Sequence, residues 1–140
     1  MKTVRPSRLL KAALLLDAGI SGATGALQMA LTAEVSGLLQ LPPALLMESG
    51  VVMVVYAALL MLLVRASKVA SALVGAVAAG NVVWTLLCIG MAVTGTPPTN
   101  ALGTGFLLLQ AAMTLTFAGL QFRGLQLSPA APSAQTVGAH

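Results

Sequence analysis

Four long apolar stretches determine what this chain can fold into. They cover about residues 9–31, 44–64, 69–93 and 101–122, and a helix crosses a membrane with about 20 apolar residues. Only 7% of the residues are charged, whereas a soluble domain carries roughly 25%. The sequence therefore predicts an all-α four-helix transmembrane bundle. A basic segment (residues 1–8) precedes it, and a Pro-, Ala- and Ser-rich tail (residues 123–140) is predicted to be disordered.

The basic residues predict how the bundle is oriented. They lie before or at the very start of the first stretch, between the second and third, and after the fourth, and the other two loops contain no Lys or Arg. The seven residues are Lys2, Arg5, Arg8, Lys11, Arg65, Lys68 and Arg123. Under the positive-inside rule, both termini and the middle loop are cytoplasmic. We therefore expect a multi-pass protein of the bacterial inner membrane, in which the lipid bilayer is a constant partner.

The loops contain two further patterns. Between the first two stretches, Leu38, Leu39 and Leu41 predict a short interfacial helix, with Thr32 as its cap and Glu34 near its positive end. Double prolines, 42–43 and 97–98, precede the second and fourth stretches, and Gly50 and Gly105 each follow a pair by seven residues. This pattern indicates either two duplicated parallel hairpins or only the preference of proline for helix starts.

Polar side chains lie on one face of several spans. The first span contains Asp17, Ser21, Thr24 and Gln28 at helical spacing, and the third and fourth contain Asn81, Trp84 and Gln110. The second span contributes Tyr56, together with Glu48 near its outer end. Because lipid cannot satisfy polar groups, these faces should turn inward. They either join helices through hydrogen bonds or form a ligand or proton site from Asp17, Asn81, Tyr56, Trp84 and Gln110.

Asp17 is the residue that most needs a partner. A charged Asp at the centre of a membrane helix costs about 3 kcal/mol on the insertion scale. It therefore either finds hydrogen-bond partners on another helix or carries a proton. Asn81 lies at comparable depth and is the preferred donor, and Arg65 is the alternative. Three roles remain open for Asp17: a structural hydrogen bond, a proton or cation site, and contact with a partner subunit.

Small residues predict where helices pack closely. The first span repeats Ala18, Gly22 and Ala26 every fourth residue, and the third ends a similar series at Gly80. Such spacing lets backbones approach one another. We therefore expect the first and third spans to touch, with Gly22 and Gly80 in the contact and Ser21, Thr24 and Gln28 supporting it.

Three segments carry a resemblance to known proteins. "LLLDAGISGATGAL", "GNVVWTLL" and "FLLLQAAMTLTFAGLQFRGL" resemble small bacterial four-span proteins of unassigned function. The layout, with a leucine-rich loop after the first span, is similar to that of the DoxX-like group. The resemblance implies an accessory role beside membrane oxidoreductases and a possible link to quinone or lipid. It assigns no functional residue.

These observations favour a small non-enzymatic membrane protein. Short loops and few polar groups indicate an accessory or scaffold subunit that contacts other membrane subunits or its own copies. The alternative is a carrier or binder of a small lipophilic molecule, an ion or a proton around Asp17. A single cysteine, Cys88, and a single histidine, His140, cannot build a zinc site, and no catalytic motif, cofactor motif or nucleic-acid site is indicated.

Overall fold

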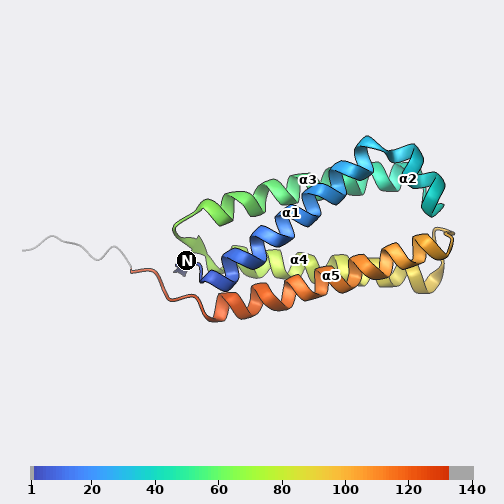
Figure 1. The fold of residues 1–140 in the computed structure, drawn as a ribbon. Coiled ribbons are helices and arrows are strands. Elements are labelled where there is room, and N and C mark those ends of the chain that lie inside the picture. Colours follow the sequence, from blue (N-terminus) through green and yellow to red (C-terminus); the bar gives the residue numbers. More distant parts are fainter. Residues whose placement is uncertain (1, 133–140) are drawn as a thin grey trace, which may run out of the picture.

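The computed structural model describes residues 2–132 and contains four long helices, a short helix and two short strands (Figure 1). In chain order these are β1 (Thr3–Val4), α1 (Arg8–Ala30), α2 (Thr32–Leu39), α3 (Pro43–Arg65), β2 (Val69–Ala70), α4 (Ser71–Thr94) and α5 (Ala101–Gln126). The four long helices are all long and apolar enough to cross a membrane. The predicted all-α four-span fold is therefore confirmed.

Local chemistry sets where the helices begin and end. The Ser7 hydroxyl accepts a hydrogen bond from Leu10 N at 3.1 Å and caps α1. Asn100 caps α5 in the same way through Gly103 N, at 2.8 Å. Pro43 is the first residue of α3, where its missing N–H costs nothing. The α4 helix stops at Gly95, whose φ of 62° is easily adopted by glycine.

The helices pack as two pairs. The α1 helix lies along α3 and α4 lies along α5, and the pairs are joined mainly through α1 and α5 (Figure 1). The backbones of α3 and α4 meet only marginally, and so do those of α1 and α4. The predicted close contact between the first and third spans is therefore wrong at the level of the backbone.

The small residues of α1 face α3 instead. A Cβ atom added at Gly25 would lie 2.7 Å from the Gly50 carbonyl oxygen, and one at Gly22 would lie 3.2 Å from Ala57 Cβ. At Gly80, by contrast, an added Cβ would meet nothing within 4 Å. Gly80 is thus not a helix-packing residue, because the small-residue spacing on α4 has no partner backbone opposite it.

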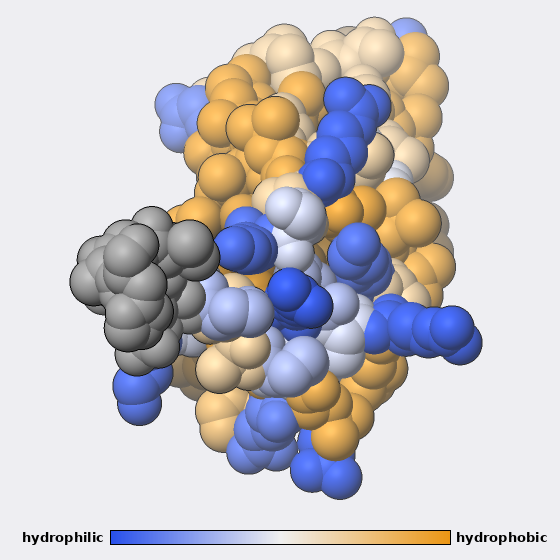
Figure 2. All heavy atoms as spheres, turned by 90° about the vertical axis from the view of Figure 1, so that its left-hand side faces the viewer, coloured by the Kyte–Doolittle hydropathy of each residue, from blue (hydrophilic) through white to orange (hydrophobic). Residues whose placement is uncertain are grey.

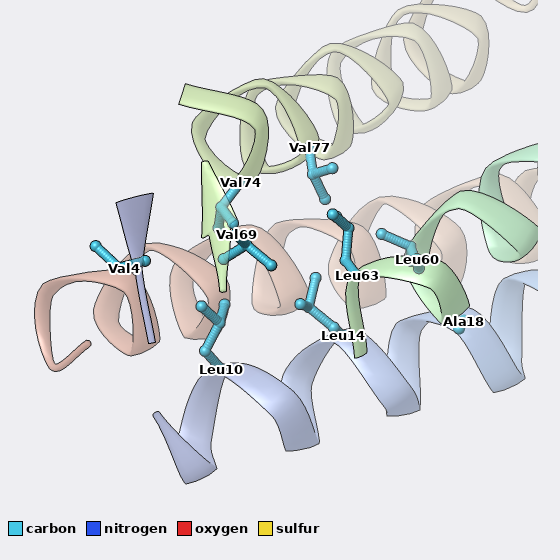
Figure 3. Packing of buried hydrophobic residues seen from close by; sticks show 9 residues of the cluster. All are labelled: Val4, Leu10, Leu14, Ala18, Leu60, Leu63, Val69, Val74 and Val77. Atoms are coloured by element: carbon cyan, nitrogen blue, oxygen red, sulfur yellow. The ribbon is translucent and has the colours of Figure 1, made fainter. Parts of the chain in front are cut away.

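One end of the bundle is closed by the chain termini. β1 pairs antiparallel with β2, and Val4 also bridges to Ala130. Beneath them lies a cluster in which Leu10 and Leu14 pack against residues from α3 and α4 (Figure 3). Hydrophilic residues gather on this end of the molecule, with apolar surface around them (Figure 2). This is the end that the basic residues assign to the cytoplasm.

The predicted disordered tail needs a correction. The α5 helix continues to Gln126, beyond the expected end of the span, and Arg5 N donates to the Pro129 carbonyl at 2.9 Å. Residues 123–132 are thus structured, because backbone pairing with the N-terminus needs no apolar side-chain pattern. The rest of the predicted tail, residues 133–140, lies outside the described residues.

The other end is closed by α2. As expected, a short helix follows the first span, and its Leu39 is buried while Leu38 is 61% exposed. The Asn100 side chain donates to the Leu38 carbonyl at 2.8 Å and ties α2 to the start of α5. Thr32 does not cap α2, because its hydroxyl donates to the Gln28 carbonyl of α1 at 2.6 Å.

The two hairpins differ where the duplication would make them alike. Pro43 is the first residue of α3, whereas Pro98 stands three residues before the first residue of α5. Gly50 contacts another backbone closely, and Gly105 has open space around it. Duplication therefore stays a prediction.

Candidate functional site

Asp17 is fully buried at the centre of a hydrogen-bond network to which all four long helices contribute. Its exposed fraction is 0%. Oδ1 accepts from the Ser21 hydroxyl, one turn further along α1, at 2.9 Å. Oδ2 accepts from the Tyr56 hydroxyl of α3 at 3.0 Å, from Asn81 Nδ2 of α4 at 2.8 Å and from Gln121 Nε2 of α5 at 2.7 Å. A carboxylate only accepts hydrogen bonds, and here four donors surround it, three on Oδ2 and one on Oδ1.

A second layer holds the donors in place. Asn81 uses its other amide hydrogen on Gln121 Oε1, at 3.1 Å. The Thr85 hydroxyl donates to the Asn81 carbonyl at 2.9 Å and lies 2.8 Å from the Thr114 hydroxyl. Two of the four donors, Asn81 and Gln121, are therefore restrained by further hydrogen bonds.

No cationic side chain compensates Asp17 within residues 2–132. Arg65, the alternative partner considered from the sequence, is exposed at the end of α3, and no ion pair joins it to Asp17. The preferred partner, Asn81, does contact the carboxylate. The hydrogen-bond partners of Asp17 are therefore neutral amides and hydroxyls, as is common where helices are joined inside membranes.

A cavity of about 180 Å³ lies directly beside this network. It is lined by Ser21, Val52, Met53, Tyr56, Gly80, Asn81, Trp84 and Thr114. The lining includes three of the four side chains that donate to Asp17, but not Asp17 itself. We call this the inner cavity. It exists because α3 and α4 do not pack together at this level.

A second cavity of about 290 Å³ adjoins the first and extends to the outer end of the bundle. Both share Val52 and Trp84 in their walls. The lining of this outer cavity is mostly apolar and includes Leu46, Cys88 and Phe106, with Gln28, Gln110, Ser49 and Glu48 as its polar members. The two cavities share walls along α3 and α4, and we call them together the cleft; Val52, which belongs to both walls, is 55% exposed.

The five residues predicted as a ligand or proton site all lie along this cleft or behind it. Asp17, Tyr56 and Asn81 belong to the buried network. Trp84 stands between the cavities, and its Nε1 donates to Gln110 Oε1 at 3.0 Å. The structure thus places these side chains together, although the sequence alone could not say on which side of the bundle.

The residues predicted for helix packing have different surroundings. Ser21 binds Asp17 within its own helix, and Gln28 Oε1 accepts from the Ser49 hydroxyl of α3 at 3.0 Å. Gly22 faces α3, and Thr24 is half-buried. Gly80 lines the inner cavity, so its missing side chain leaves room there.

Gln121 is the member of the network that the sequence analysis did not select. It lies eleven residues, about three helical turns, after Gln110 on the same face of α5. Its exposed fraction is 0%. The shared face of Gln110 and Gln121 was the signal that could have identified it, because a fully buried Gln in a membrane span needs a polar partner.

Comparison with known proteins adds no relative. No protein family, no curated protein and no solved structure matches the chain. The resemblance to the DoxX-like group therefore gains no support, and the role of the site has to be argued from its own geometry.

Proposed function

We propose that this four-span membrane protein binds a small lipophilic molecule in the cleft between α3 and α4. The observation that carries the proposal is the pair of adjoining cavities, about 180 and 290 Å³ in volume, which share Val52 and Trp84 and receive side chains from all four long helices. Sites for small molecules typically measure about 300–1,000 Å³ and combine an apolar wall with a few polar groups. The cleft has both features, since Leu46 and Phe106 line one part and Tyr56 and Asn81 another.

The route into the cleft favours a ligand that arrives from the lipid. Val52 lines both cavities and is 55% exposed on the lipid-facing side of the bundle. The cytoplasmic end is closed by the cluster around Leu10 and Leu63, and the outer end by α2. A molecule dissolved in the bilayer would therefore enter sideways between the helices.

Fluorescence of the single tryptophan can test this proposal. Trp84 lies in the wall of both cavities, so a bound alkyl chain carrying a bromine quencher should quench its emission in a saturable way. We expect Val52→Phe, which fills the mouth, to abolish saturable quenching in reconstituted vesicles. Val55→Phe is the matched control, because Val55 is on the same helix, 65% exposed to lipid, and not in the cavity wall. Equal quenching in both variants would contradict the proposal.

The second candidate function is the accessory or scaffold subunit expected from the sequence. The observation in its favour is that Asp17 is fully buried and does not line either cavity, so its carboxylate joins helices without being exposed itself. A scaffold would tolerate a filled cleft. Two results together would favour this second function. The wild type would show no saturable quenching, and Val52→Phe would still co-purify with other membrane subunits or with a second copy.

A further inference from the structure

We propose that the inner cavity selects a head group that donates hydrogen bonds, and an ammonium group above all. This inference rests on the proposed function, because it names the chemistry of the molecule that the cleft would hold. It follows from which hydrogen-bonding atoms in the cavity wall are already used and which are free.

Every side-chain donor in the wall of the inner cavity is committed. Ser21, Tyr56 and Asn81 donate to Asp17, and the second amide hydrogen of Asn81 goes to Gln121. The remaining two donors of the wall also have partners, since Trp84 Nε1 donates to the Gln110 side chain and the Thr114 hydroxyl donates to the Gln110 carbonyl. A ligand that only accepts hydrogen bonds would thus have to break one of these bonds.

The acceptors of the same wall, unlike its donors, are not all used. A hydroxyl oxygen that has donated its hydrogen still carries lone pairs, which applies to Ser21 and Tyr56. Asn81 Oδ1 has no hydrogen bond within residues 2–132. Every fully buried side-chain oxygen or nitrogen in that part of the chain does have a hydrogen-bond partner. Asn81 Oδ1 must therefore be accessible, and the cavity is the space beside it. Hydrogen bonds to Asp17 thus use the donors of Ser21, Tyr56 and Asn81, while Asn81 Oδ1 has no donor bound to it in the described part of the chain.

The charge distribution adds a preference for a cation. Asp17 lies one layer behind the wall and has no cationic side chain beside it in the described part of the chain. The outer cavity contains a second carboxylate, Glu48, and no Lys or Arg lines either cavity. The aromatic side chains Tyr56 and Trp84 also line the inner cavity, and aromatic rings attract cations through their faces.

The outer cavity does not impose the same selection. Its wall contains the side-chain amides of Gln28 and Gln110, which offer both donors and acceptors. The remaining lining is largely apolar, so it suits an alkyl chain. We therefore place the head group in the inner cavity and the chain in the outer cavity or in the adjoining lipid.

A set of matched ligands tests the inference. Brominated alkyl chains of equal length, ending in an ammonium, a hydroxyl or a methyl ester, are titrated against Trp84 fluorescence in vesicles of neutral lipid. We expect the ammonium compound to bind about tenfold or more tightly than the ester, with the alcohol between them, since a hydrogen bond to or from a charged group stabilises more than a neutral one. An ester that binds as tightly as the ammonium compound overturns the inference but leaves the proposed function standing. Absence of saturable binding for all three compounds overturns both.

Two variants separate head-group recognition from a general loss of structure. Tyr56→Phe removes one acceptor from the wall. It should weaken the binding of the ammonium and alcohol compounds several-fold and leave the binding of the ester unchanged. Asp17→Asn removes the carboxylate and should abolish the preference for ammonium over alcohol. If Asp17→Asn does not fold, Tyr56→Phe alone decides. Equal weakening of all three compounds by Tyr56→Phe would contradict the inference.

Discussion

Gln121 Nε2 donates to Asp17 Oδ2 at 2.7 Å and so joins the last span directly to the first, 104 positions apart in sequence. The α1 and α5 helices form the main contact between the two helix pairs of the bundle. This hydrogen bond lies within that contact and is fully buried. It therefore contributes to the contact between the two pairs, while the backbones of α3 and α4 on the opposite side barely meet.

Replacing Gln121 should destabilise the bundle. In Gln121→Leu the side chain keeps a similar size but can no longer donate, so Asp17 loses one of its four donors. We expect a loss of about 1–3 kcal/mol, the usual cost of leaving a buried polar group short of a partner. The midpoint of unfolding in a denaturing detergent measures it. Gln126→Leu, an exposed position at the end of the same helix, is the control and should change the midpoint little.

The contact between α1 and α3 gives a second prediction. A Cβ atom at Gly25 would lie 2.7 Å from the Gly50 carbonyl oxygen, which belongs to a backbone and cannot move aside. Gly25→Ala should therefore force the two helices apart and cost about 1–3 kcal/mol, as overpacking in a core does. The thermal unfolding midpoint of the purified protein in detergent reports this loss.

A glycine-to-alanine substitution elsewhere on α1 should have the opposite effect on stability. An added Cβ at Gly19 meets nothing within 4 Å. Gly19→Ala should stabilise the helix by about 0.5–1 kcal/mol, because alanine loses less conformational freedom than glycine. If Gly25→Ala and Gly19→Ala changed the unfolding midpoint alike, the close approach of the helices at Gly25 would not be what limits stability.

The sequence was sufficient for the spans and for the identity of most of the polar residues. Hydropathy located all four helices within a few residues, since lipid contact requires long apolar segments whatever their neighbours are. The buried polar face of α1 followed from helical spacing, and Asp17, Ser21 and Gln28 are all buried. The expected contact between Asp17 and Asn81 is present as well.

Which helices are neighbours could not be predicted. The small residues of α1 fit any close backbone, and α3 rather than α4 provides it, through Gly50 and Ala57. The cleft follows from that choice of neighbours, because pairing α1 with α3 and α4 with α5 leaves α3 and α4 apart. Composition also could not reveal the strand pairing of Val4 with Val69 and Ala130, since backbone hydrogen bonds leave little trace in so short a segment.

The N-terminal end of α1 gives a fourth prediction. The Ser7 hydroxyl accepts from Leu10 N at 3.1 Å and donates to the Gly124 carbonyl at 2.8 Å, so it caps α1 and ties α1 to α5. Ser7→Ala should cost about 0.5–2 kcal/mol, the usual loss for an N-cap serine. Ser67→Ala, at an exposed position of the α3–α4 loop, is the control. The detergent unfolding midpoint should fall for the first variant only, and an equal fall for both would contradict the capping role.

The orientation of the bundle gives the last prediction. The structure places both ends of the described chain and the α3–α4 loop at one end of the molecule, and all seven basic residues lie at or near that end. By the positive-inside rule we expect this end to face the cytoplasm. In a Cys88→Ala background, which removes the single native thiol, cysteines are placed at the exposed positions Ser67 and Thr96. A membrane-impermeant maleimide should label Thr96→Cys in intact bacterial cells and Ser67→Cys only after the membrane is permeabilised. The reverse pattern would place Glu48 and the outer cavity toward the cytoplasm, and equal labelling of both would mean that the protein inserts in two orientations.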